Sequence, residues 1–178
     1  MHKAPSPVSK IEETMTASLK NNKWIFLLLC LIWLGCDPNK VYEDYQEIPD
    51  GVWNVDQPVS FQVDIDDTTK GNNIIVEIRH TPSYPFQNLY LFLHTTYPDG
   101  EKSKDSLMFY LMEPSGKPLG DCAGDLCDAR FLFRENVHFP LRGPYTFELM
   151  HTMRVANGLL PGILDIGFRI EHYSTPKP

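Results

Sequence analysis

Two groups of side chains in this sequence have the chemistry of metal ligands. Calcium prefers carboxylate oxygens, and three aspartates stand close together: Asp64, Asp66 and Asp67. Zinc prefers histidine and cysteine, and four histidines occur in separate segments: His80, His94, His138 and His151. The aspartates lack the Asp/Asn/Gly order of an EF-hand, and the histidines lack the close spacing of HxH or HExxH. We therefore expect no metal site and no cofactor, with the aspartates on the wet face of a strand and the histidines at edges or surfaces.

Motifs for covalent catalysis or phosphate binding do not occur in the sequence. It contains no GxSxG nucleophile motif and no glycine-rich loop that would cradle phosphate. Paired carboxylates for glycoside hydrolysis come together only in the fold, so sequence leaves that chemistry open. We expect no catalytic residue and no enzymatic activity.

Cys122 and Cys127 are the two cysteines of the chain body and suggest a disulfide. They lie in the segment GDCAGDLCDA, and an even number of cysteines in an exported chain favours a disulfide. Five residues of extended strand would hold their Cα atoms roughly 16 Å apart, too far for a bond, so the segment must turn at residues 123–125. Free thiols remain the alternative, since a metal would need further ligands.

The N-terminus has the pattern of a bacterial lipoprotein signal. Two lysines, Lys20 and Lys23, precede the apolar run WIFLLLCLIWL at 24–34, and Gly35 and Cys36 follow it. The run is about 18 Å long as a helix, too short for a bilayer core of about 30 Å, and fits a secretory signal peptide. We expect residues 1–35 to be removed and Cys36 to carry the lipid, although Trp33 departs from the usual lipobox. Translation starting at Met15 would leave a more compact signal.

Composition excludes some classes of function. Hydrophobic residues make up 42 % of 178 residues, and the net charge is −7 without a basic run. This excludes a typical nucleic-acid binder, which needs a basic stripe. Without residues 1–35 the chain has 12 basic and 21 acidic residues, a net charge of −9, so charge would not draw it to anionic lipids.

Period-two alternation of apolar residues predicts an all-β fold. The alternating segments lie near residues 59–65, 74–79, 89–94, 107–111, 131–133, 145–150 and 164–171, separated by Pro, Gly and Asp turns. We expect one antiparallel β-sandwich of two sheets and seven or eight strands, jelly-roll-like, over residues 49–173. Residues 36–48 show no clean period and predict a tether, and residues 174–178 predict a tail.

Two segments are candidates for partner binding. Residues 113–130 form the longest gap between predicted strands, and long loops in compact domains are often functional or cross-linked. The segment 84–92 carries several aromatics, among which Tyr84, Phe86 and Tyr90 are the candidate contact residues. The alternative is that this segment belongs to the core.

Several segments in order resemble the gliding-motility lipoprotein family GldH of the Bacteroidota. They are IPDGVW at 48–53, FQVDIDDTTK at 61–70, SYPFQNLYLFLHTTYPDG at 83–100, RENVHFP at 134–140, YTFEL at 145–149 and MRVANGLLPGILDIGFRIE at 153–171. The resemblance covers nearly all of the chain after Cys36, and its specificity lies in the ordered set. The cysteine pair is not a feature of the family pattern.

The resemblance implies an accessory, non-enzymatic envelope lipoprotein. It would stabilise the gliding apparatus and, through it, type IX secretion by binding other envelope proteins, anchored to the membrane through Cys36. We expect the outer membrane, with the domain facing the periplasm. The alternative function is a glycan-binding surface lipoprotein, which would present two or three coplanar exposed aromatics.

Overall fold

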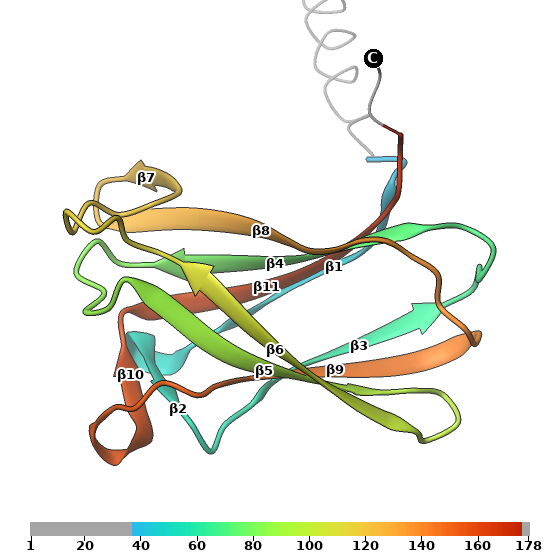
Figure 1. Ribbon diagram of the computed structural model, residues 1–178, viewed down its shortest axis with the longest axis horizontal. Helices are drawn as coiled ribbons and strands as arrows, with labels where there is room; N and C mark the ends of the chain where they lie inside the picture. Colours follow the sequence, from blue (N-terminus) through green and yellow to red (C-terminus); the bar gives the residue numbers. More distant parts are fainter. Residues whose placement is uncertain (1–36, 176–178) are drawn as a thin grey trace, which may run out of the picture. The chain divides into compact units, whose positions relative to one another are not determined.

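The computed structural model describes residues 37–175, in which β-strands predominate (Figure 1). The signal peptide, Met15, Cys36 and residues 176–178 lie outside the described residues. Eight strands form the body of the domain: β1 (Lys40–Glu47), β3 (Val59–Ile65), β4 (Asn72–His80), β5 (Asn88–Thr96), β6 (Lys102–Tyr110), β8 (Leu126–Val137), β9 (Gly143–His151) and β11 (Ile163–His172). Short elements accompany them: β2 (Val52–Asn54), β7 (Asp121–Ala123), β10 (Leu159–Pro161), η2 (Pro49–Gly51) and η3 (Ala156–Gly158).

The strands form two main antiparallel sheets in a jelly-roll order. The first sheet has the order β1-β11-β4-β8-β7, the second has the order β3-β9-β5-β6, and β10 pairs with β2 in a small third sheet. Among the eight main strands, the first in the chain pairs with the last (β1–β11) and the second with the seventh (β3–β9). The third pairs with the sixth (β4–β8), and the fourth with the fifth (β5–β6). This is a long hairpin closed by the β5–β6 turn and rolled into two layers, the jelly roll. The expected all-β sandwich is confirmed.

Alternating apolar side chains fill the space between the two sheets. In β3 every second residue is buried, and β9 repeats the pattern. Phe168 of the first sheet packs against Phe61 and Phe147 of the second, with ring centroids 5.4 and 4.7 Å apart. Burying each such ring contributes about 1.5–3 kcal/mol, which is why period-two alternation predicts the fold well.

The expected tether is wrong for residues 40–47, which form strand β1 at the edge of the first sheet. Residues of β1 pair with β11 from Lys40 to Glu47. Tyr45 lies across Gly167, where a β-carbon would come within 2.5 Å of its ring, and Glu43 pairs with Arg169 at 2.8 Å. An edge strand held by an aromatic ring and an ion pair has no apolar alternation, so the sequence carried no strand signal.

The expected long loop at 113–130 is also wrong for its second half, residues 121–130, which forms strand on both sides of a two-residue turn. β7 and the start of β8 form a tight hairpin within it, and β8 runs for 12 residues rather than the short strand expected around Phe131 and Phe133. Gly124 begins the two-residue turn with φ +62°, a conformation that glycine adopts at little cost. The remaining connection, 111–120, is shorter and includes a bridge between Met112 and Pro118.

The connections between strands lie at two opposite ends of the sandwich (Figure 1). At the end that we call proximal, β1 begins at Lys40 and β11 ends at His172, beside the β3–β4, β5–β6 and β8–β9 connections. At the opposite, distal end lie the β7–β8 hairpin, the β2–β10 sheet and the β4–β5 connection. Residues 37–175 contain no helix long and apolar enough to cross a bilayer.

Candidate interaction face

The outer surface of the second sheet carries a group of apolar side chains. Leu89, Leu91 and Leu93 of β5 point into the core, so alternation turns their neighbours outward. Tyr90, Met108 and Tyr110 are 47 %, 41 % and 54 % exposed, among the most exposed large apolar side chains of the described residues. With the partly exposed Phe92 and Met150 they form what we call the aromatic–methionine face: Tyr90, Phe92, Met108, Tyr110 and Met150.

Strand register brings these residues together. Tyr90 is directly opposite Met108, and Phe92 is opposite Met150 on the other side of β5. Directly paired residues hold their Cβ atoms about 4.5–5.5 Å apart, so side chains on the three strands make one continuous surface. Aromatic residues and methionine are enriched at protein interfaces, the former for their contact area and the latter for its adaptable shape.

Polar groups border the face on one side. The Lys104 ammonium lies 3.4 Å from the centre of the Phe92 ring, and His94 stacks on the same ring at 6.4 Å. His94 is in turn paired across the strands with Glu148. An apolar centre with a charged border is the anatomy of a protein-binding patch.

The outer surface of the first sheet has a different character. Its central strands carry an ion-pair network: Arg169 contacts Glu43 and Glu171, both at 2.8 Å, and Arg130 reaches Glu171 at 3.2 Å and Glu77 at 3.4 Å. These charges are compensated within the sheet itself. This surface therefore offers a partner few uncompensated groups, and the second sheet is the better candidate.

Of the three expected contact residues, only Tyr90 lies on the aromatic–methionine face. Tyr84 is 4 % exposed and belongs to the core, and its hydroxyl donates to the Asn88 carbonyl at 2.9 Å. Burial raises the pKa of the Tyr84 phenol. Phe86 is partly buried, edge-on to the Tyr84 ring at 5.9 Å. The expectation for Tyr84 is wrong because residues 81–87 are a turn that folds back onto the distal end, and strand β5 begins only at Asn88.

Sequence reasoning did not connect Met108 and Tyr110 with Tyr90. The alternation in β6 did place Met108 and Tyr110 opposite to Leu107 and Phe109, and this is what the structure shows. The sequence did not show that β6 pairs with β5, in a register that sets Tyr90 opposite Met108.

Cys122 and Cys127 face each other in the distal hairpin. They are directly paired between β7 and β8, with Cα atoms 4.0 Å apart and sulfurs 2.06 Å apart, a bonded distance. Cys127 is buried and Cys122 is exposed. The cross-link holds a three-residue edge strand against β8.

Three of the residues considered as metal ligands have hydrogen bonds to other groups of the fold: Asp67, His80 and His151. Asp67 accepts hydrogen bonds from the Thr69 amide and hydroxyl at 2.9 and 2.6 Å, which lower the pKa of its carboxyl group and fix the β3–β4 turn. The expected edge or surface position is wrong for His80 and His151, because both are buried. His80 lies 3.1 Å from two backbone carbonyl oxygens, and His151 donates to the Trp53 carbonyl at 3.0 Å. Within residues 37–175 no three metal-ligating side chains cluster.

Comparison with known proteins confirms the resemblance noted in the sequence. The family model of the GldH lipoprotein matches residues 40–170. The chain is 33 % identical over 153 residues to "Gliding motility lipoprotein GldH homolog" of Christiangramia forsetii, covering 83 % of this chain and 93 % of that protein. It is 30 % identical over 155 residues to "Gliding motility lipoprotein GldH" of Flavobacterium johnsoniae, covering 84 % and 96 %. A solved structure of infectious bursal disease virus, Gt strain, aligns with 80 % of this chain and 47 % of the viral chain at 11 % identity, with a TM-score of 0.15, and bears no weight.

The match begins at Lys40 and ends at Ile170, so it includes β1 and nearly all of β11, the two strands that close the rolled hairpin. The family model therefore spans strands of both sheets of the sandwich. The chain belongs to the GldH lipoprotein family.

Proposed function

We propose that this chain is a non-enzymatic accessory lipoprotein of the gliding-motility and type IX secretion apparatus. It acts by binding other envelope proteins through the aromatic–methionine face. The observation that carries the proposal is the exposure of Tyr90, Met108 and Tyr110 on one continuous surface of a family whose members are named for gliding motility. Exposed apolar patches of this kind mark sites of association.

The anchor is part of the proposal. As a GldH-family lipoprotein the chain is attached to the cell envelope by lipid, and Cys36 is the residue with the required sequence context. We propose that it sits in the outer membrane facing the periplasm. With β1 beginning at Lys40, the tether is only a few residues long, so the domain works close to the bilayer.

Photocrosslinking in cells tests the proposal at single residues. A photoreactive phenylalanine analogue at position 110 should yield adducts with envelope proteins, identified by mass spectrometry. Leu132 is a matched control, because it is 53 % exposed against 54 % for Tyr110 but lies on the first sheet. Equal adducts from positions 110 and 132, or none from 110, would contradict the assignment of the face.

The same variants separate the two functional classes. A glycan binder would present Tyr90 and Tyr110 to sugar rings. Oligosaccharide binding by the purified wild-type lipoprotein that is lost in Tyr90→Ala, together with no envelope adduct at position 110, would establish the glycan-binding function instead. Adducts with envelope proteins and no measurable sugar binding support the accessory function.

A further inference from the structure

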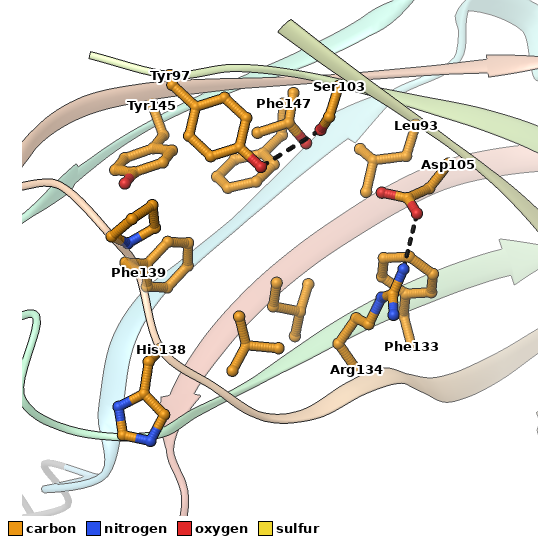
Figure 2. A pocket seen from close by; sticks show the side chains of 14 residues that line it. Leu93, Tyr97, Ser103, Asp105, Phe133, Arg134, His138, Phe139, Tyr145 and Phe147 are labelled. Carbon is orange, nitrogen blue, oxygen red and sulfur yellow. Dashed lines mark hydrogen bonds and ion pairs between the residues drawn. The ribbon is translucent and has the colours of Figure 1, made fainter. Parts of the chain in front are cut away.

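A second feature, away from the aromatic–methionine face, is a cavity of about 230 Å³ between the two sheets (Figure 2). It lies where the sandwich has free strand edges, because β6 ends the second sheet and β7 covers only the first residues of β8. The walls are mainly apolar: Ile74, Leu93, Phe133, Val137, Phe139 and Phe147. Phe133 and Val137 are only partly buried, so the cavity opens to the outside at this edge.

The cavity exceeds what tight packing leaves inside a domain. Voids larger than a water molecule are few in protein interiors, and an engineered cavity of about 150 Å³ is large enough to bind benzene. An apolar, partly open space of this size suits a flexible hydrocarbon. Among its polar lining residues, the Tyr97 hydroxyl donates to the Ser103 hydroxyl at 3.5 Å.

Charges of both signs stand at the opening. Arg134 of β8 contacts Asp105 of β6 at 2.7 Å, and Figure 2 shows the two side chains meeting at one side of the cavity, beside Phe133. Among the described residues, only Asp105 hydrogen-bonds the Arg134 guanidinium, through one nitrogen, which leaves its other N–H groups for a further acceptor. His138 lines the same cavity on the side away from this ion pair (Figure 2). A head group with an anionic and a cationic part matches this opening better than a purely anionic one, which Asp105 would repel.

The cavity is at the proximal end, where the chain leaves toward Cys36. Its lining includes Phe139 and Tyr97, from the β8–β9 and β5–β6 connections of that end. Four residues from Lys40 back to Cys36 reach at most about 14 Å. If Cys36 carries the lipid, as the proposed function holds, this opening is kept near the membrane surface.

We propose that this cavity binds an acyl chain of a zwitterionic glycerophospholipid, with its phosphate on Arg134 and its ammonium group on Asp105. The lipid enters between the edges of β6 and β8. Its binding would fix the domain at the bilayer in one orientation, with the distal end turned away from the membrane.

A photoreactive phospholipid tests this directly. The full lipoprotein is reconstituted into vesicles of phosphatidylethanolamine that contain a phosphatidylethanolamine with a diazirine in its acyl chain. After illumination, mass spectrometry should find the label on peptides containing residues 133–147. Val137→Trp fills the cavity and should lower this labelling about tenfold, equivalent to 1.4 kcal/mol. Leu132→Trp, on the same strand but pointing outward, should label like the wild type.

The design separates this proposal from the others. Equal labelling of residues 133–147 in wild type and Val137→Trp would overturn the cavity assignment, and labelling by a photoreactive free fatty acid but not by the phospholipid would overturn the assigned ligand. Circular dichroism of the Val137→Trp variant checks that it folds, and Arg134→Ala, at an exposed side chain, provides a second variant expected to lower labelling. Envelope-protein adducts at position 110 do not enter either readout, so failure here leaves the proposed function standing.

Discussion

Truncating Tyr84 and Tyr90 separately distinguishes core from binding surface within one aromatic segment. Tyr84 is 4 % exposed, with its hydroxyl bonded to the Asn88 carbonyl at 2.9 Å, so Tyr84→Ala removes a buried ring and orphans a buried acceptor. Losing a core aromatic costs about 3–5 kcal/mol, a large part of a typical total of about 5–15 kcal/mol. At about 3–4 °C per kcal/mol for a domain of this size, the melting temperature should fall by roughly 10–20 °C.

Tyr90→Ala should leave stability nearly unchanged. Its side chain is 47 % exposed and leaves no enclosed cavity, so the change should stay within about 0.5 kcal/mol. Its contribution to partner binding should be that of an interface aromatic, about 2 kcal/mol or more, or roughly a thirtyfold weaker complex.

The assay pairs thermal unfolding by circular dichroism with recovery of crosslinked envelope partners, on the same lipoprotein preparations. Tyr84→Phe is the internal control, because it keeps the ring and removes only the hydroxyl, and it should lose about 1–3 kcal/mol. The reasoning is refuted if Tyr90→Ala melts as early as Tyr84→Ala, or if it keeps both full stability and full partner recovery.

Three further outcomes are expected. Cys36→Ser should abolish labelling by an alkyne fatty acid, and label retained in that variant would exclude Cys36 as the lipid site. Cys122 and Cys127 should resist alkylation until reduction, which should cost about 2 kcal/mol of stability for so short a loop; alkylation of unfolded, unreduced protein would show free thiols. Because burial lowers the pKa of His151, the unfolded state binds its proton first, so the free energy of unfolding should fall as pH drops below about 6.5. In a His151→Gln variant the free energy of unfolding should depend less on pH. If its pH dependence equals that of the wild type, groups other than His151 cause the loss of stability.

Much of the fold could be predicted because burial itself has a period in a strand. Val59, Phe61, Val63 and Ile65 alternate with polar residues because only one face of β3 meets the core, and the family resemblance supplied order and extent. The same logic failed for β1, where Tyr45 is fixed by Gly167 of β11 and Glu43 by Arg169. Such an edge strand is specified by its partner strand, and the partner is not visible in local sequence.

The binding face could be predicted only in its parts. Local alternation predicts that Tyr90 and Phe92 point away from the core on the same face of their strand, and that Met108 and Tyr110 do so on theirs. It does not tell that β5 lies between β6 and β9, which sets Phe92 beside Met150 and Tyr90 beside Met108. That order follows from rolling the hairpin: β5 and β6 are neighbours across the central turn, and β9 pairs with the other edge of β5.

The same rolling places the two candidate sites so that they need not compete. The aromatic–methionine face occupies the outside of β5, β6 and β9, while the cavity opens between the sheets at the edges of β6 and β8. β6 contributes Met108 to the first and Asp105 to the second, and successive strand residues point to opposite faces, so odd and even positions serve different surfaces. A lipid seated at Asp105 would therefore leave Met108 free for a protein. The lipoprotein could hold the membrane and a partner at once, which is what a tethered accessory component requires.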